Sequence, residues 1–116
     1  MSHNKDLGNK GEEIAVNFLK RKGYTILDRN WIFDHKEIDI IALKNGIVVF
    51  VEVKTRTTDF FGEPYEFVNE KKQAFLIEAA NNYLIENKID LPVRFDIVSI
   101  VINRKFTKVY HIEEAF

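Results

Sequence analysis

The chain has 116 residues, of which 46% are hydrophobic and 30% are charged, and its formal net charge is −1. This length suffices for one domain with its own core, residues 1–116, and leaves no room for two. The absence of cysteine excludes disulfides, thiol catalysis and thiolate zinc sites, and the near-neutral charge argues against strong, indiscriminate binding to nucleic acid.

The first residues lack the apolar core of a signal peptide, and no apolar run approaches the roughly 20 residues of a membrane span. We therefore expect a soluble, cytoplasmic protein without a membrane partner.

Residues 6–22 are predicted to form a helix, because Leu7, Ile14 and Phe18 recur at helical spacing. Gly8 and Gly11 stand near its start. Glycine inside a helix costs about 1 kcal/mol, so close packing or the close approach of a ligand would explain these residues. Alternatively the helix begins after Gly11. Glu12 would then serve as an acidic residue of the first turn rather than as part of a site.

Residues 24–30 are predicted to form a strand, which Trp31 to Phe33 continue or end. Two apolar runs, 37–44 and 47–54, follow and are joined by Asn45 and Gly46. Asn-Gly between such runs is the strongest short-range signal for a β-hairpin, because its turn needs positive φ at both central residues.

A two-residue turn would place Asp39 opposite Glu52 and Glu37 opposite Lys54, all on one face. Like charges directly opposite each other destabilise a sheet by roughly 0.2–1 kcal/mol, and burial increases that cost. A hard divalent cation between Asp39 and Glu52 would remove the repulsion, and Lys54 would add a positive charge. Such a group suits activation of water for attack on a phosphodiester.

The segment 55–65 contains glycine and proline and is predicted to be a loop. Thr55 and Arg56 could hold phosphates there. The aromatic residues could stack on bases or anchor the loop to the core; they are Phe60, Phe61 and Tyr65.

Residues 69–86 are predicted to form a second helix with Asn69 as its N-cap. Lys72 and Gln73 occupy the first turns, where acidic residues are the usual choice. They suit a helix end that faces phosphate, although simple exposure to solvent explains them equally well.

Residues 93–102 and 106–112 complete the pattern as two strands joined by a turn at 103–105. Asp96 is a rival catalytic carboxylate, but we expect it to pair with Arg94. The order of elements predicts an α/β fold in which helices flank a central mixed sheet of about five strands. The hairpin strands are expected to be central in that sheet.

Glu12, Asp39 and Glu52-Val53-Lys54 together resemble the signature of the PD-(D/E)XK nuclease superfamily. The likeness is closer to the YraN-type family, which is similar to archaeal Holliday-junction resolvases. Nearly the whole chain takes part, through motifs that include Gly11-Glu12, Asn30-Trp31, Glu37-Ile38-Asp39, Glu52-Val53-Lys54-Thr55-Arg56, Lys72 and Arg94-Phe95-Asp96. Lys36 departs from the family, which tends to have glycine there.

The resemblance implies a restriction-endonuclease-like fold and Mg²⁺- or Mn²⁺-dependent cleavage of branched or single-stranded DNA. Asp39 and Glu52 would bind the metal ion, and Glu12 would complete its coordination directly or through water. Lys54 would orient the attacking water or stabilise the transition state. Glu37 would act as a base behind these residues or neutralise Lys54. A homodimer is implied only by analogy with the resolvases.

Two other hypotheses remain open at this point. The chain could be a nucleic-acid-binding module that keeps the nuclease fold without turnover. The carboxylates and lysine could also form a self-satisfied charge cluster, in which each pair contributes roughly 0.2–1 kcal/mol and no metal binds.

Overall fold

The computed structural model describes residues 3–58 and 69–116. The aromatic residues predicted to stack or anchor the loop, Phe60, Phe61 and Tyr65, lie outside these ranges. The elements follow in the order α1 (His3–Arg21), β1 (Thr25–Phe33), β2 (Lys36–Lys44), β3 (Ile47–Arg56), α2 (Glu70–Glu86), β4 (Val93–Ile102) and β5 (Thr107–Ile112).

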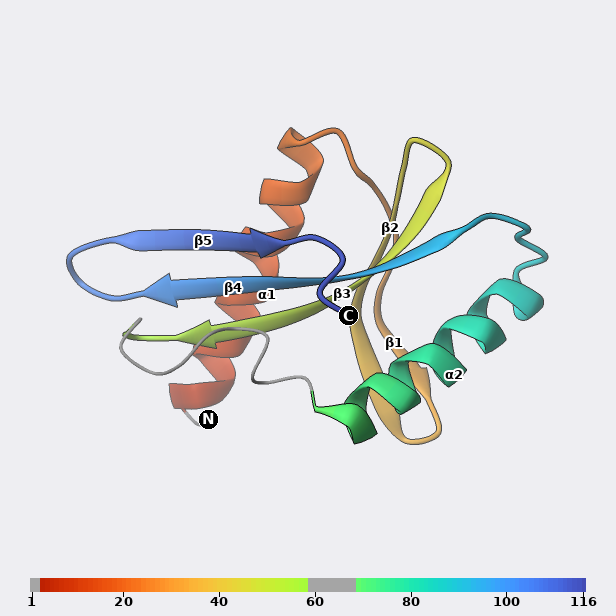
Figure 1. Cartoon of the computed structure of the whole chain (residues 1–116). Helices are drawn as coiled ribbons and strands as arrows, with labels where there is room; N and C mark the ends of the chain where they lie inside the picture. The colour runs from red at the N-terminus through yellow and green to blue at the C-terminus, as the bar shows by residue number, and fades with distance from the viewer. Residues whose placement is uncertain (1–2, 59–68) are drawn as a thin grey trace.

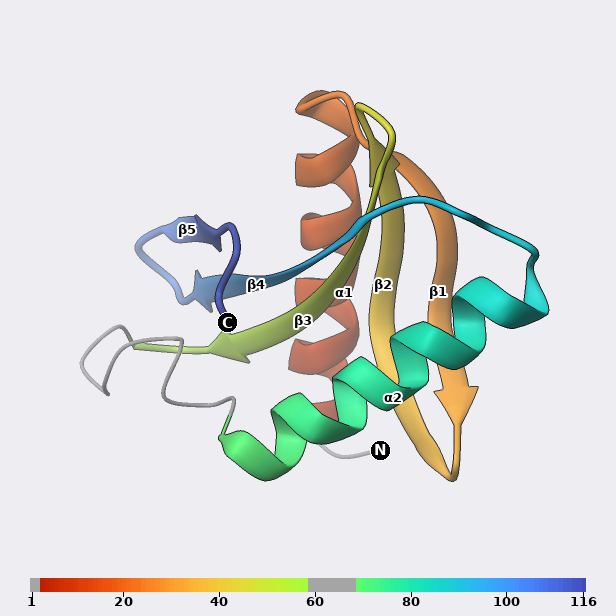
Figure 2. The same ribbon diagram turned by 45° about the vertical axis from the view of Figure 1, so that its right-hand side comes forward.

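The five strands form one mixed sheet in the order β1-β2-β3-β4-β5. Only β3 and β4 run parallel, and the other neighbours are antiparallel. Figures 1 and 2 show that α1 covers one face of this sheet and α2 the other. The fold is thus the predicted α/β, restriction-endonuclease-like arrangement, with β3 in the centre of the sheet.

Two buried clusters fasten the helices to the sheet. On the α1 face, Ala15 and Leu19 pack against residues of β2, β3 and β4, including Val51 and Val98. On the α2 face, Leu76 and Tyr83 pack against a second set that includes Phe50. Alternation along β3 therefore assigns successive side chains to opposite helices.

The turn at Asn45 and Gly46 has the positive φ at both residues that the hairpin prediction requires, 52° and 74°. It also has the predicted register, in which Lys44 faces Ile47. Asn69 caps α2 as predicted by accepting a hydrogen bond from the Lys72 amide at 2.9 Å.

Two predicted boundaries were wrong. The helix α1 begins at His3 and contains both glycines, so the alternative start after Gly11 is excluded and Glu12 does not lie in a first turn. Thr55 and Arg56 belong to β3 rather than to a loop, because the parallel pairing with β4 continues as far as Arg56 and Val101.

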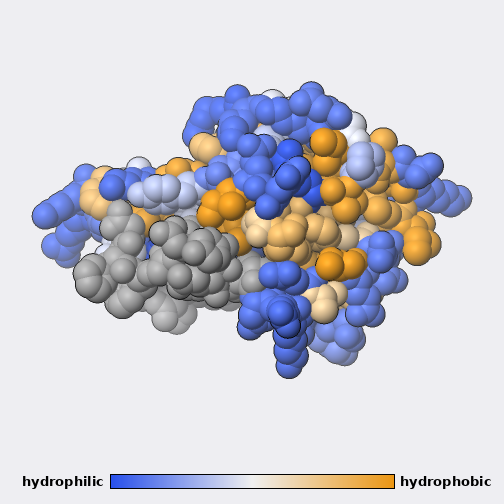
Figure 3. Space-filling model, in the orientation of Figure 1, coloured by the Kyte–Doolittle hydropathy of each residue, from blue (hydrophilic) through white to orange (hydrophobic). Residues whose placement is uncertain are grey.

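The surface in Figure 3 is hydrophilic around its periphery, and apolar residues gather towards the middle of the face shown. Within residues 3–58 and 69–116, neither helix combines the length and apolar character needed to cross a membrane.

Candidate functional site

The site lies where β2 and β3 separate. Their antiparallel pairing runs from Lys44–Ile47 to Ile40–Val51 and does not extend to Asp39 and Glu52. The predicted opposition of these two acids as a paired register position was therefore wrong. Beyond Val51, β3 remains paired with β4 on its other edge, and the Asp39 Oδ2 atom accepts a hydrogen bond at 2.8 Å from the Val53 amide on the edge that β2 has left.

Glu52 points to the α2 side of β3 and is only 7% exposed. The Lys72 ammonium on α2 lies 3.6 Å from Glu52 Oε2, and the Lys54 ammonium lies 3.9 Å from Oε1. These are ion-pair distances longer than hydrogen bonds. Oε2 is buried, and no atom of the described residues donates a hydrogen bond to it. An unsatisfied buried carboxylate oxygen is unusual and is a ready ligand for a cation.

Glu12 reaches the same region from α1. Its Oε1 atom accepts a hydrogen bond at 2.8 Å from the side-chain amide of Asn30, which also contacts Glu37 at 3.3 Å. Glu37 therefore lies with Glu12 on the α1 side, and the prediction that it faces Lys54 was wrong. Across the sheet, Glu37 pairs with Ile32 of β1.

Gly11 explains how α1 comes so close to β3. A Cβ atom at this position would lie 2.8 Å from Thr55 Cγ2 and 2.9 Å from Thr55 Cβ, and closer still to Thr55 Oγ1. Only glycine allows the helix to cross the strand at this distance. The crossing brings Glu12, the next residue, beside the gap between β2 and β3.

Burial and mutual repulsion dominate the electrostatics of the acids. Burial raises the pKa of Asp39 to about 7, and the nearby charges of Glu52 and Glu12 add to the shift. Burial also raises the pKa of Glu52, although Lys72 and Lys54 oppose the change. Ionisation of both carboxylates is thus unfavourable in these surroundings, and additional positive charge nearby would stabilise their ionised forms.

The acidic side chains of the site can be compared with the ligands that a divalent metal ion requires. In the described part of the chain, no three acidic or histidine side chains gather closely enough to form a ready coordination cage. Mg²⁺, however, is commonly held by one or two carboxylates, with waters and substrate phosphates completing its octahedron. Asp39 and Glu52 fit that mode, since the Val53 amide bonds to Asp39 Oδ2 rather than to Oδ1, and none of the described residues donates to Glu52 Oε2.

The predicted phosphate-binding residues are divided between two elements. Thr55 lies beneath Gly11 on the α1 face, and Arg56 is the last residue of β3. Lys72 and Gln73 lie in the first turn of α2, where the Gln73 amide donates to the Asn69 carbonyl. Of these four, Lys72 forms an ion pair with a candidate acid, Glu52.

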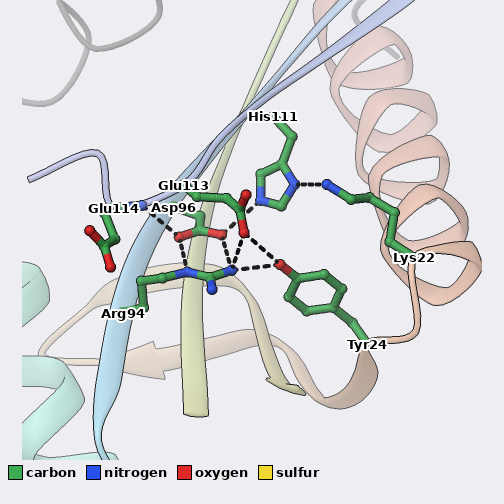
Figure 4. Close-up of polar contacts among 7 residues, drawn as sticks. All are labelled: Lys22, Tyr24, Arg94, Asp96, His111, Glu113 and Glu114. Atoms are coloured by element: carbon green, nitrogen blue, oxygen red, sulfur yellow. Dashed lines mark hydrogen bonds and ion pairs between the residues drawn. The ribbon is translucent and has the colours of Figure 1, made fainter. Parts of the chain in front are cut away.

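Asp96, the rival carboxylate, is fully engaged, as Figure 4 shows. Arg94 donates to both of its oxygens at 2.8 Å, His111 Nε2 donates to Oδ2 at 2.7 Å, and the Glu114 amide donates to Oδ1 at 3.2 Å. A carboxylate has about four acceptor positions, so Asp96 has none left for a metal ion. The predicted pairing with Arg94 is confirmed.

His111 completes a polar chain that runs to α1. Because a carboxylate only accepts, Nε2 carries the proton, and Nδ1 accepts from the Lys22 ammonium at 2.8 Å (Figure 4). The Arg94 guanidinium also donates to the Tyr24 hydroxyl at 2.5 Å. This cluster ties the connection between α1 and β1, which contains Lys22 and Tyr24, to β4 and β5.

Sequence reasoning missed Asn30, which joins Glu12 to Glu37. It has a positive φ of 50°, a conformation that asparagine tolerates better than most residues. The strand gave no clear signal for this role, because the polar residues Asp28 and Arg29 directly precede Asn30. The role of Lys72 as a partner of Glu52 was also missed, because it depends on the packing of α2.

The chain matches the family described as "Uncharacterised protein family UPF0102" over residues 11–100. It is 49% identical to a UPF0102 protein of Flavobacterium psychrophilum over 116 residues, covering 100% of this chain and 98% of the relative. It is 44% identical to one from Christiangramia forsetii, at 100% and 98% coverage, and 47% identical to one from Alkaliphilus oremlandii, at 97% and 99%.

Proposed function

The chain belongs to the UPF0102 family, the YraN-type family, and from its site we propose that it is a metal-dependent endonuclease that hydrolyses phosphodiester bonds in DNA. Branched or single-stranded DNA is the proposed substrate, by analogy with the resolvases. The supporting observation is the pair of buried carboxylates whose pKa values are raised, Asp39 and Glu52. Glu52 has one oxygen to which no described residue donates, and its carboxylate is paired with Lys54 and Lys72.

In this proposal Asp39 and Glu52 hold Mg²⁺ or Mn²⁺, and Glu12 binds it directly or through water. The metal would lower the pKa of a water molecule and polarise the scissile phosphate. The Val53 amide fixes Asp39 by occupying one of its oxygens, which leaves the other for the ion. Lys54 contributes positive charge beside the phosphate, where negative charge develops.

Cleavage by the parent protein and by Glu52→Gln tests this proposal. With Mn²⁺, the parent is expected to cut a four-way junction or a flap in preference to a linear duplex, and the variant to cut at least about 100-fold more slowly, because it lacks the ligand charge. Glu78→Gln is the control, since Glu78 is an exposed acid on α2. Equal rates in parent and Glu52→Gln would reject the assignment.

Calorimetric titration of Mn²⁺ measures the ion site without a DNA substrate. The parent is expected to bind the ion, and Asp39→Asn to bind it at least about tenfold more weakly, because hard cations prefer charged oxygen ligands. Asparagine retains an oxygen that can accept from the Val53 amide, so the fold should persist. Absence of binding in the parent would instead favour the self-satisfied charge cluster.

The second candidate is a nucleic-acid-binding module without turnover. It is favoured by the ion pairs of Lys54 and Lys72 with Glu52, which partly compensate the acid without a metal. Salt-dependent DNA binding together with no Mn²⁺-dependent cutting would select this alternative.

A further inference from the structure

A pocket of about 550 Å³ opens between the first turns of α1 and the ends of β3 and β4. Leu7 and Ile102 supply its apolar part. Lys10 and Arg104 supply two positive charges, which Asp6 offsets in part. The volume falls within the range of about 300–1,000 Å³ that is typical of small-ligand sites.

One wall of the pocket is rigidly built. The Asn103 side chain accepts hydrogen bonds from the amides of Lys105 and Phe106, at 2.9 Å and 3.1 Å, and donates to the Thr57 carbonyl at 3.0 Å. This fixes the β4–β5 turn against the end of β3. Arg104 is therefore held on an ordered turn beside the apolar wall.

The two cations of the pocket are open to an anionic ligand. Within residues 3–58 and 69–116, neither Lys10 nor Arg104 has an acidic partner at ion-pair distance. Positive charge beside an apolar wall suits a ligand with an uncharged planar part and a negatively charged part, which describes a nucleotide.

The pocket and Glu52 lie on opposite faces of the sheet. Leu7 and Ile102 of the pocket belong to the buried cluster on the α1 face, whereas Glu52 points towards Lys72 of α2. Within α1, Leu7 and Lys10 precede Gly11, where the helix crosses β3, and Glu12 of the candidate active site follows it.

We propose that this pocket binds one unstacked nucleotide of single-stranded DNA, with Lys10 and Arg104 on the phosphates and Leu7 and Ile102 against the base. This proposal deepens the endonuclease assignment, on which it rests for its substrate class. It makes an unpaired nucleotide, held on the α1 face away from Glu52, a feature that the protein recognises, because paired and stacked bases cannot enter a pocket.

Binding of a fluorescent dT12 strand and of a blunt 12-base-pair duplex to the full chain, in EDTA, tests the pocket without cleavage. The double variant Lys10→Ala/Arg104→Ala is expected to bind dT12 about tenfold more weakly, because each lost phosphate contact lowers affinity severalfold at moderate salt. The slope of log affinity against log salt should fall by about 1.4 for two contacts to a single strand. Binding to the duplex should change less.

The matched control is Lys20→Ala/Arg21→Ala, which removes the same charge from exposed residues at the other end of α1. This control should not weaken binding to dT12 more than it weakens binding to the duplex. Equal loss in both double variants, or no loss in Lys10→Ala/Arg104→Ala, overturns the proposal.

An abasic 12-mer tests the place of the base. The parent should prefer dT12 to this strand severalfold, and Leu7→Ala should reduce that preference without changing the salt slope. If the parent does not distinguish the strands, no base enters the pocket and the proposal is wrong. If Lys10→Ala/Arg104→Ala selectively loses binding to dT12 while the parent shows no metal-dependent cutting, the endonuclease assignment is rejected and the pocket proposal is retained.

Discussion

Two buried carboxylates on the neighbouring parallel strands β3 and β4 have opposite surroundings. Asp96 receives four hydrogen bonds, whereas Glu52 has one buried oxygen to which none of the described residues donates. Burial raises the pKa of Asp96, but the hydrogen bonds from His111, Arg94 and the Glu114 amide outweigh it, so the pKa lies below its ordinary value. One acid is thus part of the scaffold, and the other is available for chemistry.

The surroundings of Asp96 predict how stability depends on pH. Its pKa is lower in the folded protein than in the unfolded chain, so its contribution is present above the unfolded value of about 3.9 and is lost as pH falls through the folded value. Asp96→Asn should therefore reduce the free energy of unfolding by about 3 kcal/mol at pH 7, because it removes the buried charge partner of a largely buried arginine and leaves only the half-exposed Glu113. Urea unfolding at pH 7 and at pH 3 measures both effects.

Glu113→Gln is the control for that measurement. Glu113 also pairs with Arg94, at 3.2 Å, but its side chain is 54% exposed. Exposed pairs contribute about 0–1 kcal/mol, so this variant should unfold almost as the parent does. If both variants lost equal stability, burial of Asp96 would not be the cause.

Among the elements, α1 combines two glycines that have different surroundings. A Cβ atom at Gly8 would have no neighbour within 4 Å, whereas one at Gly11 would overlap Thr55 of β3. The sequence allows either close packing or a helix start for both glycines. The structure assigns close packing to Gly11 alone.

Alanine at each of these positions separates the two effects. Gly8→Ala should stabilise the protein by about 1 kcal/mol through helix propensity. Gly11→Ala should destabilise it by about 1–3 kcal/mol, because the helix must move away from the strand. Thermal unfolding of the two variants gives the comparison, and a stabilising Gly11→Ala would show that α1 can shift freely. Since the shift would also carry Glu12 away, Gly11→Ala should cut DNA more slowly than Gly8→Ala.

At the scale of the whole molecule, local patterns predicted most of the fold. Apolar alternation and the Asn45-Gly46 turn determine β2 and β3, and helical spacing and the Asn69 cap determine α2. The point where β2 and β3 separate was not predictable in this way, because apolar residues continue both strands past it, at Ile38 and Val53. Helix α1 also begins three residues before its predicted start, at His3.

Asp39 lies just beyond the last paired residues of β2 and β3, where the backbone hydrogen bonds between the two strands have ended. Its carboxylate takes the place of a strand carbonyl by accepting the Val53 amide, so the same side chain closes the backbone and faces the acids around it. Architecture and reactivity are therefore inseparable at this residue. A substitution that extended the pairing of β2 and β3 would stabilise the hairpin. It would also close the opening through which an ion and a phosphate must enter.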